Sequence, residues 1–140
     1  MIMKSAKVII YDKNGNILLL TRSETHPKYA LHLDLPGGLL ENDESFESTV
    51  KRECLEEIGL DINTRDLELV KKIRFPHMTR SLFKIQLNDV KPDIKLSWEH
   101  SEYKWFSEEE IRKMKTSEKF DPYYNMLVEY LKNKDDKIII

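Results

Sequence analysis

Short apolar runs near the start of the chain predict two β-strands. Residues 6–11 and 17–21 are mostly apolar, and each run is too short for a typical helix. Between them, residues 12–16 contain an Asn-Gly pair, which readily adopts the positive φ angles of a tight turn, so we expect a β-hairpin. The polar residues 22–34 have no clear period and predict a loop. The Pro-Gly-Gly run at 36–38 then excludes a helix.

A helix is predicted over residues 45–58. Apolar side chains recur there at every fourth position, from Phe46 to Ile58, and form one stripe on a helical surface. Gly59 follows directly, and glycine often ends a helix because it tolerates the left-handed conformation. Both the helix and its end are therefore predicted from local sequence.

Strands and helices follow one another irregularly in the second half of the chain. Two apolar runs joined through residues 76–79 predict a second hairpin, and a capping box between Ser107 and Glu110 predicts the start of a short helix. The elements expected here are strands at 67–75, 80–87 and 103–106, a helix from Ser107 to about Lys115, and a helix at 122–132. Since no regular β-α-β repeat is present, we predict an α+β fold, an α/β/α sandwich in which helices flank a mixed sheet.

The composition limits what the chain can be. Its 140 residues fit a single domain, 1–140, and a chain of this length can bury a core without disulfides or bound metal. The 23 basic and 25 acidic residues give a net charge of -2, which argues against a nucleic-acid-binding protein. Cys54 is the only cysteine, and neither a membrane-length apolar run nor a signal peptide is present. We therefore expect a cytoplasmic protein without membrane contact.

Three acidic residues crowd the C-terminal half of the predicted helix. Glu53 lies three and four residues before Glu56 and Glu57, so the carboxylates share one neighbourhood, and the helix dipole opposes negative charge at this end. A hard divalent cation would reverse that penalty, because Mg²⁺ binds carboxylate oxygens together with substrate phosphates. Composition alone also allows a simpler explanation, a solvated charged face that is relieved by Arg52, four residues before Glu56.

The spacing of the surrounding residues favours the metal site. Gly38 is followed by five residues, Glu44, seven residues and then the run Arg52-Glu-Cys-Leu-Glu-Glu-Ile-Gly-Leu60. This block resembles the Nudix box, G-x5-E-x7-R-E-U-x-E-E-x-G-U, at every fixed position, with Cys54 in place of the first bulky aliphatic residue U. The flanking segments 35–38 and 99–106 are also similar to this family.

The resemblance to Nudix hydrolases implies an activity, a cofactor and a set of site residues. The activity is hydrolysis of a phosphoanhydride bond in a nucleoside diphosphate linked to another group, as in nucleoside triphosphates, ADP-ribose or nucleotide sugars. The cofactor is Mg²⁺, for which Mn²⁺ can substitute. The residues implied are Glu53, Glu56, Glu57 and the Gly37 carbonyl as metal ligands, Arg52 as the catalytic residue that orients them, and Gly38, Glu44 and Gly59 as structural residues of the box.

The general base, the substrate contacts and catalysis itself stay open at this point. The base is either Glu53, on the helix, or Glu99, in a later loop that can close over substrate. Trp98, His100 and Tyr103 are candidates for substrate contact, since they are near Glu99 in sequence and exposed aromatic faces stack on bases. The alternative function is a nucleotide-sensing module with the same fold and no activity.

Association with a second copy of the chain is also an expectation. The resemblance is compatible with a homodimer. The last residues, Ile138–Ile140, are all β-branched and apolar, and we expect them to dock on the sheet or on a partner subunit.

Overall fold

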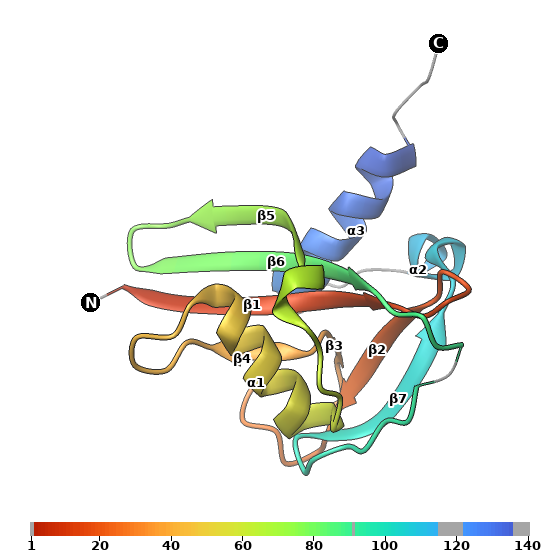
Figure 1. Cartoon of the computed structure of the whole chain (residues 1–140), viewed down its shortest axis with the longest axis horizontal. Coiled ribbons are helices and arrows are strands. Elements are labelled where there is room, and N and C mark those ends of the chain that lie inside the picture. Colours follow the sequence, from red (N-terminus) through yellow and green to blue (C-terminus); the bar gives the residue numbers. More distant parts are fainter. Residues whose placement is uncertain (1, 91, 115–121, 136–140) are drawn as a thin grey trace.

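The sheet and its flanking helices are seen in a computed structural model that describes residues 2–90, 92–114 and 122–135 (Figure 1). The predicted contact of Ile138–Ile140 lies outside these residues. The elements are β1 (Met3–Tyr11), β2 (Ile17–Arg22), β3 (Leu33–Asp34), β4 (Gly37–Leu39), α1 (Phe46–Ile58), the 3-10 helix η1 (Thr64–Asp66), β5 (Glu68–Arg74), β6 (Met78–Gln86), β7 (His100–Phe106), α2 (Glu108–Lys113) and α3 (Pro122–Asp135).

The strands form one mixed sheet in the order β3-β2-β1-β6-β5, with β4 also paired to β1 and β7 to β2. β1 and β6 are parallel over their whole length, from Met3 beside Met78 to Tyr11 beside Gln86, and the other pairs are antiparallel. Helix α1 crosses one face of the sheet and α3 lies against the other (Figure 1). The predicted α+β sandwich with a mixed sheet is therefore confirmed.

Alternate residues of β1 and β2 supply the cores of both layers. Ala6, Val8 and Ile10 pack with the buried stripe of α1, while Ile9 and Tyr11 pack with α3. Two neighbouring strands that are apolar on both faces are what a sheet buried between two helical layers requires. In the described part of the chain, no helix is long and apolar enough to cross a membrane.

The helix predictions are confirmed, with small differences at the ends. The Ser45 side chain caps the first turn of α1 by accepting the Ser48 N–H at 3.0 Å. Gly59 ends the helix at φ +69°, where its N–H donates to the Leu55 carbonyl. The capping box between Ser107 and Glu110 is formed at the start of α2.

The strand predictions are correct for the second hairpin and incomplete elsewhere. β5 and β6 pair as expected, but β1 and β2 share only the pair Tyr11–Ile17 and then diverge to other partners. The loop predicted at 22–34 contains β3, and β4 was missed beside the Pro-Gly-Gly run. With two and three residues, these strands are too short to show a period. They matter because β4 carries the glycines of the site.

Candidate active site

Helix α1 presents three carboxylates that differ in burial. The Glu57 side chain is 3% exposed and lies against β4, the Glu53 side chain is 15% exposed, and the Glu56 side chain is 59% exposed. The gradient follows from helical geometry, because Val50, Cys54 and Ile58 form the stripe that packs on the sheet. Glu57, Glu53 and Glu56 lie progressively farther around the helix from that stripe. The site therefore opens from the core toward solvent along one side of the last turns of α1.

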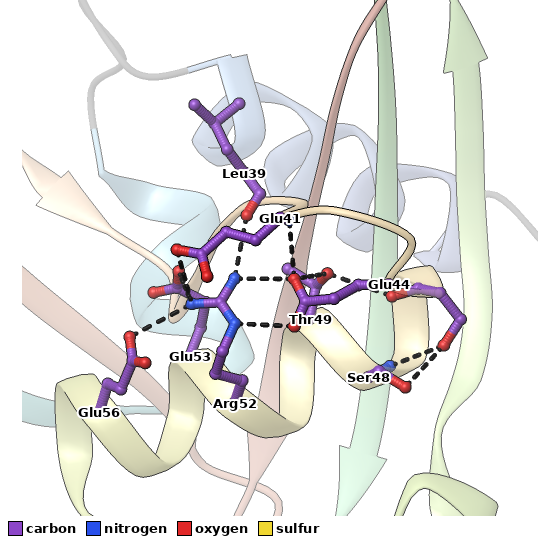
Figure 2. Close-up of polar contacts among 9 residues, drawn as sticks. Leu39, Glu41, Glu44, Ser48, Thr49, Arg52, Glu53 and Glu56 are labelled. Carbon is purple, nitrogen blue, oxygen red and sulfur yellow. Dashed lines mark hydrogen bonds and ion pairs between the residues drawn. The ribbon is translucent and has the colours of Figure 1, made fainter.

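Arg52 connects this helix to the loop before it, as Figure 2 shows. Its Nε and Nη2 donate to the two Glu44 carboxylate oxygens at 2.8 and 3.0 Å, and Nη2 also donates to the Leu39 carbonyl at 3.1 Å. Its Nη1 donates to Glu53 at 2.9 Å and to Glu56 at 3.3 Å. The bond to Arg52 is the main reason that the pKa of Glu44 falls to about 2. A planar guanidinium can fix several carboxylates in this way.

Two glycines of β4 allow the backbone to approach the carboxylates. The Gly37 N–H donates to Glu57 Oε1 at 2.8 Å. Gly37 has φ +138°, and a β-carbon there would collide with the Ala6 carbonyl oxygen of β1. A β-carbon on Gly38 would lie 2.9 Å from the Glu53 carboxylate. Only glycine fits at either position without displacing its neighbour.

The loop before β7 brings Glu99 to the same place. Its backbone follows the end of α1, with the Ser97 N–H donating to the Glu57 carbonyl at 3.0 Å and the Lys95 N–H to the Ile58 carbonyl at 2.8 Å. The Glu99 side chain is 37% exposed, and its Oε2 lies 3.9 Å from Nε2 of His26. The loop thus satisfies carbonyls that the end of a helix leaves without partners.

The carboxylates influence one another electrostatically. Burial raises the pKa of Glu57 well above its ordinary value, and Lys7 opposes this shift. Burial also raises the pKa of Glu53, with Arg52 opposing the shift and the charges of Glu56 and Glu99 adding to it. A divalent cation would favour the ionised forms of all of them.

The donor set suits a hard cation. Glu53, Glu56, Glu57 and Glu99 offer only carboxylate oxygens, the ligands of Mg²⁺, Ca²⁺ and Mn²⁺. Among the residues that the structure describes, no three His, Cys, Asp or Glu side chains converge as a ready metal site. The cause is visible in their bonds, since Arg52 holds Glu53 and Glu56 and the Gly37 amide holds Glu57.

A buried ion cluster beneath these carboxylates was not predicted. Asp34 of β3 forms ion pairs with Lys7 of β1 and with Arg22 of β2, the latter at 3.2 Å, and accepts a 2.9 Å hydrogen bond from His100 Nε2. Burial alone would raise the pKa of Asp34, but Lys7, His100 and Arg22 outweigh it and hold that pKa well below its usual range. The signal in the sequence was Lys7 itself, a charge inside an otherwise apolar strand.

A cavity of about 420 Å³ opens beside the cluster, within the size range of small-molecule sites. Its floor is the α3 side of β1 and β6, and Tyr123 of α3 forms a wall. Glu57, Glu99 and the two glycines of β4 lie at one side. The main lining residues are Met3, Ser5, Lys7, Arg22, Asp34, Gly37, Gly38, Leu39, Glu57, Met78, Arg80, Glu99 and Tyr123.

The three residues expected to touch substrate lie outside this cavity. His100 is buried behind Glu57 and bonded to Asp34, which argues against the substrate contact predicted for it. Trp98 and Tyr103 are exposed but do not line the cavity. The aromatic side chains found in its lining are Tyr29 and Tyr123, which come from a loop and from α3 and which no local motif marked.

A larger cavity, of about 630 Å³, lies at the other end of β1 and α3. Its charged groups pair with one another, as Lys134 does with Glu108 at 2.8 Å and Lys84 with Glu68 at 3.6 Å. It contains none of the clustered glutamates. The smaller cavity is therefore the better candidate for an active site, because Glu57 of the carboxylate cluster and the two glycines of β4 line it.

Known proteins resemble the chain over most of its length. A family model described as NUDIX domain matches residues 1–126. The crystal structure of a MutT protein from Methanosarcina mazei Go1 is 31% identical, covers 96% of each chain and has a TM-score of 0.72. An Ap4A hydrolase from C. elegans is 22% identical over 96% of each chain, with a TM-score of 0.68. A bifunctional NMN adenylyltransferase/ADP ribose pyrophosphatase from Francisella tularensis, complexed with AMP and a Mn ion, is 20% identical over 76% of this chain and 34% of that chain, with a TM-score of 0.63.

Proposed function

The chain belongs to the Nudix family of pyrophosphohydrolases, and we propose that it uses Mg²⁺ to hydrolyse a phosphoanhydride bond in a nucleotide bound in the 420 Å³ cavity. One observation carries the proposal. Glu57 and Glu99 line the same cavity as Lys7 and Arg22, so that carboxylates for a cation and cations for phosphate face a single space. Two of the relatives named above, the Ap4A hydrolase and the ADP ribose pyrophosphatase complexed with AMP, act on or bind nucleotides, which supports this class of substrate.

Glu53, Glu56 and Glu57 would hold the metal ion, with the Gly37 carbonyl as a backbone ligand. When bound, Mg²⁺ neutralises charge on phosphate oxygens and increases the acidity of water. Arg52 holds the Glu53 and Glu56 carboxylates in place, and Glu44 fixes Arg52 by accepting two hydrogen bonds from it. Gly38 lets the backbone of β4 pass close to Glu53, and Gly59 ends α1 in the left-handed conformation. Mn²⁺, which prefers the same oxygen donors, would substitute.

Lys7, Arg22 and Arg80 supply positive charge along the cavity for the phosphates. Met3, Met78 and Tyr123 supply the apolar surface against which the base or sugar packs. This division is typical of small-molecule sites, which combine mostly apolar walls with a few polar groups.

Glu99 is the general base in this proposal. It lines the cavity and is 37% exposed, whereas a Glu53 oxygen is engaged by Arg52 at 2.9 Å. A base has to be within reach of the water whose proton it accepts, and a carboxylate at the rim of the cavity satisfies that condition better. Glu53 then serves the metal ion alone.

A substrate panel tests the activity. Purified protein is given dNTPs, ADP-ribose, dinucleoside polyphosphates and sugar nucleotides, each with Mg²⁺, with Mn²⁺ or with EDTA, and the release of nucleoside monophosphate is measured. We expect turnover of at least one class that requires the metal. Binding of nucleotide without turnover under every condition would contradict the hydrolase and support the nucleotide-sensing module instead.

Two substitutions separate the roles of the glutamates. Glu99→Gln should lower kcat by about 10²–10⁴ at saturating Mg²⁺, the usual contribution of a general base. Glu53→Gln should also raise the Mg²⁺ concentration needed for half-maximal rate. Glu47→Gln, the same change at an exposed position on the first turn of α1, is the control and should keep full activity. If Glu99→Gln retains the kcat of this control, Glu99 is not the base.

A further inference from the structure

A bulge at the start of β7 turns His100 into the protein. Thr21 of β2 pairs with Glu102, so an unbroken ladder would place Ser101 beside Arg22, but the register shifts and His100 takes that place. Side chains alternate between the faces of a strand, and a one-residue shift sends a side chain to the opposite face. The His100 side chain is consequently 0% exposed.

Asp34 fixes the orientation of the buried ring. Its Oδ2 lies 2.9 Å from His100 Nε2, and its other oxygen is held by Lys7 and Arg22. Because these cations keep Asp34 ionised, the carboxylate accepts and Nε2 donates. A carboxylate with three side-chain partners from three strands has little freedom to turn, and neither has the ring that is bonded to it.

The second ring nitrogen points at the candidate metal ligand. His100 Nδ1 lies 3.7 Å from Glu57 Oε2 and has no hydrogen-bond partner within the described residues. A buried polar atom without a partner is uncommon in folded proteins and calls for an explanation. The other Glu57 oxygen already accepts the Gly37 N–H, so Oε2 is the atom whose position is least constrained by the backbone.

We propose that His100 is a positioning residue for Glu57. Asp34 aims the ring, and Nδ1 limits the positions of Glu57 Oε2 to those from which it reaches a divalent cation. The inference rests on the proposed function, since it needs Glu57 as a metal ligand. It gives His100 a role through another residue, in place of the substrate contact expected from its sequence position.

Paired substitutions separate the two nitrogens. His100→Gln keeps a polar atom near Nε2, and so the contact with Asp34, but lacks Nδ1. His100→Asn places its amide near Nδ1 and loses the bond to Asp34. The matched control is His77→Gln, because His77 is exposed in the β5–β6 turn, outside the cavity lining.

Metal affinity and stability are measured on the nucleotide-free protein. The Kd for Mn²⁺ is taken from the electron paramagnetic resonance signal of free Mn²⁺, the Kd for Mg²⁺ from competition, and Tm from metal-free samples. His100→Gln should raise both Kd values by about 10–100-fold, the usual effect of removing a group that orients a ligand, with Tm nearly unchanged. His100→Asn should lower Tm and keep a Kd closer to that of the unaltered protein, and His77→Gln should change neither.

The contrary results are equally specific. If His100→Gln binds Mn²⁺ as tightly as the unaltered protein does, the inference is wrong. If that variant does not fold, ¹⁵N-histidine spectra of the unaltered protein decide: Mg²⁺ should shift the His100 Nδ1 resonance and leave His77 unmoved, and an unmoved His100 at saturation overturns the proposal. An unaltered protein that binds neither cation overturns the proposed function itself, and the role of His100 with it.

Discussion

Replacing Asp34 by Asn tests how much the fold depends on its buried ion cluster. The substitution keeps the size of the side chain but removes the charge that Lys7, Arg22 and His100 share. All four side chains are at most 10% exposed, so water cannot replace the lost partner. Removing one member of a buried ion pair costs about 3–5 kcal/mol. Since domains are stable by only about 5–15 kcal/mol, the variant should lose a large part of its free energy of unfolding.

Urea unfolding at pH 7, followed by circular dichroism, measures this loss. The dependence on pH gives a second and independent readout. The folded pKa of Asp34 lies below its unfolded value, so the contribution of the ionised group is complete above about pH 4 and declines as the pH falls further toward the folded pKa. As the pH falls below about 4, the unaltered protein should therefore lose stability more steeply than Asp34→Asn.

The control is the same substitution in an exposed ion pair. Asp61 lies 2.6 Å from Lys51, but its side chain is 69% exposed, and such pairs contribute about 0–1 kcal/mol. Asp61→Asn should leave both the urea midpoint and the pH dependence almost unchanged. If Asp34→Asn costs no more than Asp61→Asn, the reasoning from burial is refuted, and the cluster does not stabilise the fold.

Two further substitutions probe the glycine pair and a helix cap. Gly38→Ala places a β-carbon 2.9 Å from the Glu53 carboxylate, so it should push that carboxylate aside and lower kcat/KM at least tenfold. Urea unfolding should show a far smaller loss than in Asp34→Asn, because a side chain is displaced and not the backbone. Activity that equals the unaltered rate would show that the position of Glu53 is not critical. Ser107→Ala removes the cap of α2 and should cost about 1 kcal/mol of stability with kcat unchanged, and a loss of kcat would place α2 closer to the site than its contacts indicate.

The parts of the fold that the sequence predicts are those with local causes. The stripe from Phe46 to Ile58 and the glycine after it determine α1 within one segment, and the carboxylate cluster on that helix follows from its spacing. β3 and β4 have no such cause. They are short segments that become strands only because β1 and β2 offer them open edges to pair with, and that requires the tertiary structure.

The ion cluster beneath the site was missed for a related reason. Asp34 is 27 residues from Lys7 and 66 from His100 in the chain, so no motif spacing connects them. His100 also has neighbours in sequence, Glu99 and Ser101, that suggest an exposed loop. Only the register shift opposite Arg22 turns its ring inward, and a bulge of that kind depends on the partner strand.

The Asp34 carboxylate connects the phosphate side of the proposed site with its metal side. Asp34 holds Lys7 and Arg22 on the cavity side and His100 on the side of Glu57. With Glu57 ionised, as it has to be to bind a cation, Lys7 and Arg22 balance Asp34 and Glu57, so these four groups together have little net charge. A divalent cation alone would upset that balance in one direction and a pyrophosphate alone in the other, whereas the two together nearly cancel. Metal and nucleotide should therefore each favour the binding of the other, because the charge of each offsets the charge that the other brings next to the same buried ions.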